Sequence, residues 1–303
     1  MAGLIRTAAV LALGALAACS QFGSDEPRAS ERAFMPLMWT PSEISTAGYE
    51  SSPTFTPDGR EMYYVSANPQ FRDYQILMSR CVEGKWTRGH VPSFARPLPI
   101  IEADPAITHD GKRLYFISSR HAPEKEDFDI WYVDRAEEGW GQPVRLPAPV
   151  NTTSSEIFPR PGADGRLYFG SDRPGGHGAG DIYAATQSPS GEWKVENLGP
   201  PISTAADDYE AEISRNGRTM IVVSDRGDKS HLYRFVLKNG KWAETGRIEA
   251  APDVFQVGPL LSPGGDRLLF AQAARARSGE MYLIDLTDDP DRVWPPCAGP
   301  AAP

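Results

Sequence analysis

The chain has 303 residues, a formal net charge of −9, and 28 residues each of glycine and proline. This length allows one large domain or two small ones, and the lack of any basic cluster argues against binding nucleic acid or an anionic membrane through a positive surface. No long window shows the 3.6-residue apolar period of an amphipathic helix, so we expect an all-β protein.

The N-terminal residues 1–19 have the features of a targeting segment and are excluded from the fold. Arg6 supplies a positive charge, and residues 7–18 form an apolar run that is too short to span a bilayer. The run ends in Leu16-Ala17-Ala18-Cys19, which resembles a bacterial lipobox, in which the cysteine is acylated and becomes the mature N-terminus. The alternative is an ordinary signal peptide with an incidental cysteine.

The lipobox resemblance also implies a location for the protein. Ser20 follows the cysteine, which by similarity to Gram-negative lipoproteins implies a lipid-anchored protein on the periplasmic side of the outer membrane. The only expected membrane contact is this anchor. Residues 20–33 are mostly polar and predict a flexible tether.

Five turn dipeptides then recur with a spacing of about 50 residues, which is typical of a radial or solenoid repeat. Such dipeptides suit tight hairpins because they tolerate positive φ. The five are Asp58-Gly59, Asp110-Gly111, Asp164-Gly165, Asn216-Gly217 and Gly264-Gly265.

Each turn lies in the same pattern of predicted strands. Alternating strands follow the turns at residues 61–66, 113–118, 166–171, 218–224 and 267–271, and a third strand follows each of these. In four units a tryptophan just after a glycine begins a fourth strand: Trp86, Trp140, Trp193 and Trp242. Four antiparallel strands per unit, arranged radially, are propeller architecture. A single unit cannot bury both of its faces, so the ring must close.

The fifth unit has no Gly-x-Trp of its own, and the segments around Trp39 and Trp294 are the two candidates for its fourth strand. We favour residues 34–40, so that an N-terminal strand closes the ring. The sequence therefore predicts a β-propeller over residues 34–290, with five blades of four antiparallel strands, and a C-terminal tail over residues 291–303. Six blades would require a unit that we do not find.

Two motifs carry a family resemblance. Pro-x-Phe-x-Pro-Asp-Gly at residues 53–59, and the Ser-Asp-Arg-Pro-Gly-Gly run at 171–176 followed by Asp181-Ile182-Tyr183, resemble the WD-like repeat of TolB-type propellers. The resemblance covers residues 50–286. It implies a propeller that meets an envelope protein or a cell-wall-associated component at its channel mouth. Propellers host binding proteins, scaffolds and enzymes alike, so the fold does not decide the function.

A polar residue stands eight positions before each turn, where the innermost strand of each unit begins: Glu50, Glu102, Glu156, Asp208 and Gln256. Arg120, Arg173 and Arg226 end second strands, and should reach the same face, opposite the turns. We therefore expect a charged channel mouth there that binds the partner. Neighbouring carboxylates about 8 Å apart would repel by roughly 2 kcal/mol. We favour the arginines as compensating partners; a bound cation such as Ca²⁺, or a cationic group of a partner, is the alternative.

Loops on that face offer further contact candidates, because loops on a rigid scaffold commonly carry binding residues. These candidates are Phe71, Tyr74, His121 and His177.

Catalytic signatures are missing from the sequence. There is no Gly-x-Ser-x-Gly motif, and the five histidines lack metal-ligand spacing. The candidate carboxylates recur at equivalent positions, whereas catalytic pairs normally break a repeat, and we find no such break. We therefore expect a binding or scaffold protein that is not an enzyme and has no cofactor apart from the Ca²⁺ considered above. The alternative is a five-bladed carbohydrate-active enzyme, with acid and base carboxylates in one pocket, or a glycan-binding module.

The three cysteines complete the set of candidate residues. With Cys19 assigned to lipid, Cys81 follows a third strand of the first unit and Cys297 lies in the tail. The first and last blades are neighbours in a closed ring, and an exported protein folds in an oxidising compartment. We predict a Cys81–Cys297 disulfide that holds the tail across the seam; the alternative is two free thiols and a loose tail.

Overall fold

The computed structural model describes residues 35–124, 127–227, 229–274 and 277–297. The chain divides into two units, residues 1–33 and 34–303, and all of the described residues belong to the second. The predicted signal segment, the lipidation site Cys19 and the tether at residues 20–33 thus lie outside the described residues. Within the described ranges, no helix is long and apolar enough to cross a membrane.

The described residues form twenty strands and no helix, and antiparallel pairing divides these strands into five groups of four. We call each group a blade. Blade 1 contains β2 (Tyr49–Phe55), β3 (Glu61–Ala67), β4 (Gln75–Val82) and β5 (Lys85–Trp86); blade 2 contains β6 (Glu102–Ile107), β7 (Arg113–Ser118), β8 (Asp129–Asp134) and β9 (Val144–Arg145). Blade 3 contains β10 (Glu156–Pro161), β11 (Leu167–Ser171), β12 (Asp181–Gln187) and β13 (Trp193–Asn197); blade 4 contains β14 (Asp207–Ile213), β15 (Thr219–Asp225), β16 (Ser230–Lys238) and β17 (Lys241–Arg247). Blade 5 contains β18 (Gln256–Leu261), β19 (Arg267–Ala274), β20 (Arg277–Asp285) and β1 (Leu37–Met38).

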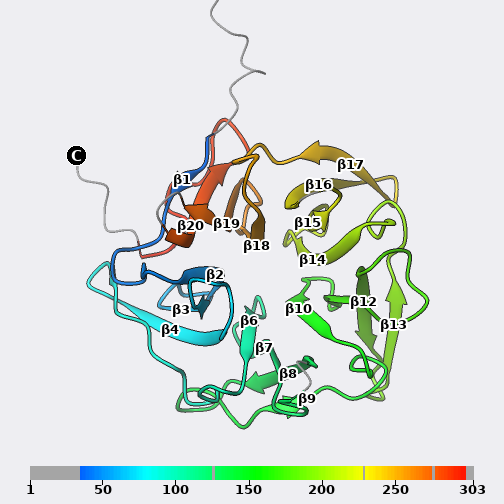
Figure 1. Ribbon diagram of the computed structural model, residues 1–303, viewed down its shortest axis with the longest axis horizontal. Helices are drawn as coiled ribbons and strands as arrows, with labels where there is room; N and C mark the ends of the chain where they lie inside the picture. The colour runs from blue at the N-terminus through cyan, green and yellow to red at the C-terminus, as the bar shows by residue number, and fades with distance from the viewer. Residues whose placement is uncertain (1–34, 125–126, 228, 275–276, 298–303) are drawn as a thin grey trace, which may run out of the picture. The chain divides into compact units, whose positions relative to one another are not determined.

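The blades surround a common centre, with the first strand of each blade innermost (Figure 1). This arrangement confirms the all-β propeller class.

The outer strand of blade 5 comes from the N-terminal segment. Leu37 pairs with Leu283 and Met38 with Tyr282, both antiparallel, and the amide of Trp39 donates to the Met281 carbonyl at 2.8 Å. The segment predicted to complete this blade therefore does so, and β20 receives a partner on its outer edge.

The C-terminal tail packs across the seam between blades 5 and 1. Cys81 and Cys297, the predicted pair, form a disulfide with a Cα–Cα distance of 5.7 Å. The Trp294 ring lies edge-on to Phe55, with 6.4 Å between centroids, and the guanidinium of Arg267 donates to the Trp294 carbonyl. Residues 291–297 thus belong to the packed structure.

The hairpin turns form as their residue types dictate. The hydroxyls of Thr56 and Thr108 donate to Asp58 Oδ1 and Asp110 Oδ1, two residues on, at 2.6 and 2.7 Å. The second residue of each turn is a glycine with φ between 66° and 79°: Gly59, Gly111, Gly165, Gly217 and Gly265. Glycine adopts this left-handed conformation without steric cost. The turns therefore fix the register between the first and second strands of each blade.

Every innermost strand also contains a register shift against its second strand. In four blades the shift includes a residue with positive φ, namely Ser52, Asp104, Phe158 or Gly258. Such a β-bulge redirects side chains locally. At Gly258 a Cβ atom would stand 2.6 Å from the Ser52 amide nitrogen, so only glycine permits this approach of blades 5 and 1. The bulges thus set which side chains meet at the centre.

Candidate functional site

Five polar residues at the first or second position of the innermost strands are buried. We call Glu50, Glu102, Glu156, Asp208 and Gln256 the strand-start residues; each is at most 1% exposed. Burial of an ionised carboxylate is costly unless hydrogen bonds and a counter-charge compensate. The partners of these residues therefore decide whether they are available to a ligand.

Glu156 shows the pattern most completely. It accepts hydrogen bonds from the Thr152 amide at 2.8 Å and the Thr152 hydroxyl at 2.6 Å. The Ser171 hydroxyl and Arg173 Nη2 donate at 3.1 and 3.0 Å. Burial raises the pKa of the Glu156 carboxyl, and these donors oppose that shift. All of the partners lie in blade 3 or in the loop that leads into it.

Glu102 repeats this arrangement in blade 2. It accepts from the Ser118 hydroxyl at 2.8 Å and from Arg120 Nε at 2.9 Å. The preceding loop adds the amide of Arg96 at 2.7 Å. Arg120 and Arg173 are therefore structural partners of their own blades' carboxylates.

The other three strand-start residues bind mainly to the preceding loop. The Thr46 hydroxyl donates to Glu50 at 2.5 Å, and the Thr204 hydroxyl to Asp208 at 2.7 Å. Gln256 donates to the carbonyl of Ala251 at 2.7 Å.

Of the three arginines, Arg226 lies farthest from the strand-start carboxylate of its own blade. Its Nη2 lies 4.0 Å from Asp208 Oδ1, while its Nη1 donates to Glu244 at 2.9 Å. It thus joins two acidic residues of blade 4 and does not point toward another blade.

Arg120 and Arg173 pair with the carboxylates of their own blades, which is the compensation that the sequence favours. Gln256 also bonds across blades, because its Oε1 lies 2.5 Å from Nδ1 of His231 in blade 4. Among the described contacts, the four acidic strand-start residues do not join into a shared charged ring. Across the described ranges, no group of three or more His, Cys, Asp or Glu side chains is arranged to hold a metal ion. The Ca²⁺ ion considered for these residues stays a prediction.

The loop aromatics also have a packing role. Phe71 lies against Tyr49, Tyr74 and Phe255, with centroid distances of 4.5, 5.1 and 5.4 Å. This cluster joins blades 5 and 1, so Phe71 and Tyr74 are not free contact residues. His121 and His177 are exposed on their loops, as predicted.

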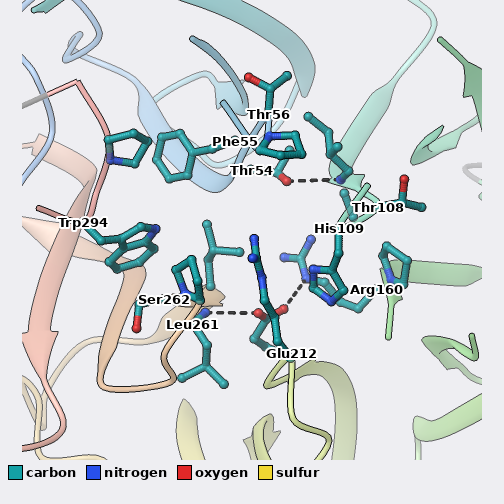
Figure 2. A pocket seen from close by; sticks show the side chains of 18 of the residues that line it. Thr54, Phe55, Thr56, Thr108, His109, Arg160, Glu212, Leu261, Ser262 and Trp294 are labelled. Atoms are coloured by element: carbon teal, nitrogen blue, oxygen red, sulfur yellow. Dashed lines mark hydrogen bonds and ion pairs between the residues drawn. The ribbon is translucent and has the colours of Figure 1, made fainter. Parts of the chain in front are cut away.

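A cavity of about 150 Å³ opens at the opposite end of the innermost strands, among the hairpin turns. We call it the turn-face cavity. Phe55 and Trp294 lie on one side, and His109, Arg160 and Glu212 lie on the other (Figure 2). The cavity therefore has an apolar side, built from blades 5 and 1 and the tail, and a polar side, built from blades 2 to 4.

A buried ionic cluster forms the polar side. Arg160 is 3% exposed; its Nη2 lies 3.0 Å from Glu210 Oε1, and its Nε lies 3.5 Å from Glu212 Oε2. The amides of Gly258 and Leu261 donate to Glu210 and Glu212 at 2.9 and 3.1 Å. The cluster thus joins blades 3, 4 and 5.

A third carboxyl, Asp104, extends the cluster to blades 1 and 2. It accepts from the Ser52 hydroxyl at 3.4 Å. Burial raises the pKa of Asp104, Glu210 and Glu212 to about 7 each, and the neighbouring Glu210 adds to the shift at Asp104. One arginine faces three buried carboxyls, so the cluster holds protons near neutral pH.

Two basic side chains complete the cavity rim. Nε2 of His109 is buried and has no hydrogen-bond partner among the described residues. Burial lowers the pKa of His109, and the nearby Arg215 lowers it further. Arg215 is exposed, and no hydrogen bond or ion pair to its side chain occurs within the described part of the chain.

The residues of this cavity do not stand at the repeated positions from which the strand-start residues were predicted. The residue type changes from blade to blade at three positions, which lie six, four and one residues before the turn. The charged or basic residues are Asp104 and Glu210 at six residues before the turn, Arg160 and Glu212 at four, and His109 and Arg215 at one. Charged residues therefore break the repeat at positions other than the strand-start residues. The signal was present as departures from the repeat.

Comparisons with known proteins find similar solved structures but no match in sequence. No protein-family model matches the chain, and no curated protein matches it in sequence. Among solved structures, TolB from Acinetobacter baumannii is similar at 18% identity and a TM-score of 0.49, over 80% of this chain and 56% of TolB. The chain thus spans little more than half the length of TolB.

Two glycoside hydrolases are similar over almost their whole length. One is a family 117 enzyme produced by the marine bacterium Zobellia galactanivorans, with 12% identity, a TM-score of 0.55, and coverage of 86% of this chain and 92% of that one. A second glycoside hydrolase has 12% identity, a TM-score of 0.52, and coverage of 85% and 92%. At such identities the likeness shows the fold alone. It nevertheless corrects the expectation that the chain is not an enzyme, because solved structures with this fold include glycoside hydrolases.

Proposed function

We propose that the chain is an envelope propeller, anchored through a lipid on Cys19 at the periplasmic side of the outer membrane. In this proposal it binds an envelope protein or a cell-wall-associated component through the turn-face cavity. The observation that carries the proposal is that four charged or basic residues that break the repeat line one cavity: His109, Arg160, Glu212 and Arg215.

The energetics support a functional role for this cavity. Taking charges out of water costs several kcal/mol per ion, and well-packed apolar residues of similar volume are often as stabilising or more so. A centre that served only to close the ring would be more stable with apolar side chains, like the buried second strands of the blades. Perturbed ionisable groups beside a cavity are typical of functional sites.

The binding face is tested by photocrosslinking in intact envelopes. A photoreactive amino acid replaces Pro263, which is exposed and lines the cavity. Its equivalents in the other blades are Pro57, His109, Ala163 and Arg215, so the position accepts varied side chains. The matched control carries the same group at His121, on the opposite face. We expect adducts with a cell-wall component or an envelope protein from position 263 only. Adducts from position 121 alone, or from neither position, would contradict the proposal.

The anchor is tested separately by metabolic labelling with a clickable fatty acid. The wild type should incorporate the label and fractionate with outer membranes, and Cys19→Ser should lose both properties. Equal labelling of the two proteins would exclude an anchor at Cys19.

A second candidate function is hydrolysis of a glycan in the same cavity. It is favoured by Glu212, which lines the cavity and whose pKa burial raises to about 7, the range that suits a general acid at neutral pH. Release of reducing ends from a polysaccharide panel tests it. Activity that falls by about a hundredfold or more in Glu212→Gln would support this candidate, and activity that is unchanged in that variant would exclude this role for Glu212.

A further inference from the structure

We propose that the turn-face cavity binds a carboxylate attached to an apolar group. The carboxylate would lie between His109 and Arg215, and the apolar group would lie against Phe55 and Trp294. This inference rests on the proposed function and names the chemical class of the ligand.

The basic side of the cavity has unused hydrogen-bonding capacity. A buried polar atom without a partner is rare and costs free energy, and His109 Nε2 is such an atom among the described residues. Arg215 comes close enough to affect the titration of His109 and forms no ion pair with a described acidic residue. Both stand one position before their turns, in blades 2 and 4. An imidazole N–H and a guanidinium together can donate to both oxygens of one carboxylate.

The acidic groups of the cavity do not provide this carboxylate. Glu212 lines the cavity, but its Oε1 accepts from the Leu261 amide and its Oε2 faces Arg160. Glu210 is held by Arg160 and by the Gly258 amide, and Asp104 by Ser52. A bound anion would therefore occupy the rim, above an internal cluster that is already paired.

The charge of that internal cluster sets a pH dependence for anion binding. Burial raises the pKa of Glu210 and Glu212 to about 7, while burial and Arg215 lower the pKa of His109 and Asp110 opposes this. As pH falls through 7, the carboxyls lose negative charge while Arg160 stays positive, and His109 moves toward its protonated form. Each change favours an anion, so affinity should increase as pH falls.

The other side of the cavity suits an apolar group. Phe55 and Trp294 meet edge to face, and Leu260 adds an aliphatic surface from blade 5. The disulfide between Cys81 and Cys297 holds the tail that carries Trp294 in this place. A cavity of about 150 Å³ accepts one small ring or one aliphatic side chain beside the carboxylate.

The decisive probe pair is benzoate and benzamide, because they have almost the same shape and differ in charge. Each is titrated against the full-length protein by calorimetry or by NMR. We expect benzoate to bind about tenfold more tightly than benzamide, as for a charge-assisted bidentate contact. Arg215→Gln should remove that difference. The control is Arg218→Gln, an exposed arginine after the same turn that does not line the cavity.

Several outcomes would overturn the inference. They are equal binding of benzoate and benzamide, no binding of either, or an equal effect of Arg215→Gln and Arg218→Gln. His109→Gln provides a second variant, and it should weaken benzoate binding while leaving the melting temperature within a few degrees of the wild type. Benzoate affinity that does not increase between pH 8 and pH 6 would contradict the assigned charge environment.

The natural carboxylate can come from a peptide C-terminus or from an acidic sugar, and matched probes distinguish the two. N-acetyl-leucine is compared with its amide, and galacturonate with galactose. A preference for the charged member of either pair supports the inference and identifies the source, and a preference in neither overturns it. If position 263 crosslinks to a partner but no probe shows a preference for the carboxylate, the proposed function is retained and only the ligand class is refuted.

Discussion

The two ends of the innermost strands follow different rules. At the strand-start end, four of five blades carry an acidic residue, and each residue is bonded within its own blade or the loop before it. At the turn end the residue types differ from blade to blade, and their contacts cross between blades or face the cavity. The comparison teaches that repetition marks what each blade needs in order to fold, whereas departures from repetition mark what the whole ring does.

Buried carboxyls are compensated within one blade at the strand-start end, and by a shared arginine from another blade at the turn end. Glu156 accepts four hydrogen bonds, one of them from the Arg173 cation of its own blade, and these compensate its burial locally. Asp104, Glu210 and Glu212 share Arg160, so their ionisation is coupled across blades. Loss of a strand-start contact should therefore destabilise one blade, whereas loss of Arg160 should destabilise the packing of all the blades around the centre.

The largest expected effect is that of Arg160→Met. The variant leaves three buried carboxyls without their cation, and breaking a buried pair in this way costs about 3–5 kcal/mol. The loss in unfolding free energy should be largest at pH 8 and smaller at pH 5, where the carboxyls can be protonated. Denaturant unfolding at both pH values measures it. Arg166→Gln, which removes a partly exposed pair with Glu196, is the control and should cost less than about 1 kcal/mol. A pH-independent loss for Arg160→Met would contradict the coupled cluster.

The second effect concerns the pH dependence of stability. Burial raises the pKa of Asp104 from 3.8 to about 7, so the folded form binds its proton more tightly than the unfolded form. Stability from this group is complete below about pH 4 and is lost as pH rises to about 7. Asp104→Asn should reduce the fall in unfolding free energy between pH 5 and pH 8, by on the order of 3 kcal/mol. An unchanged pH profile would show that Asp104 is not protonated in the folded protein.

The third effect concerns the disulfide between Cys81 and Cys297, which holds the tail that forms part of the cavity wall. Removal of the disulfide with Cys81→Ser and Cys297→Ser should cost about 2 kcal/mol, the low end of the usual range, because the β1–β20 pairing also closes blade 5. Thermal unfolding measures it. Benzoate binding should weaken as well, since the tail carries Trp294 of the apolar side. Full affinity in the double variant would mean that the tail does not form the cavity wall.

The smallest effect belongs to the strand-start end. Glu156→Gln keeps the shape of the side chain and weakens its contact with Arg173, so we expect a loss of about 1–2 kcal/mol in unfolding free energy. The exposed Glu192→Gln of the same blade is the control and should change stability by less than about 0.5 kcal/mol. A loss as large as that of Arg160→Met would remove the distinction between the two ends.

Much of the fold could be predicted because its determinants are local. The turn glycines and the strands that follow them repeat in every unit, and the Gly-x-Trp tryptophans repeat in four. Trp39 indicated which segment completes blade 5. The cavity depends instead on residues about 50 positions apart that converge only when the ring forms. Phe71 illustrates the same limit, because its partner Phe255 lies in another blade and no local pattern identifies it.

The position of Asp104 could not be predicted for a second reason. It sits in a β-bulge with φ of 53°, so strand alternation alone does not give the direction of its side chain. The buried charges of the centre therefore required the three-dimensional arrangement. What the sequence did contain was the list of positions that depart from the repeat.

The central claim is that ligand recognition belongs to the turn end of the innermost strands and structural pairing to the strand-start end. Parallel titrations of benzoate against the wild type, Arg215→Gln and Glu156→Gln test it most directly. The account predicts an affinity about tenfold lower in Arg215→Gln and unchanged in Glu156→Gln. Equal losses in the two variants, or a loss in Glu156→Gln alone, would contradict it.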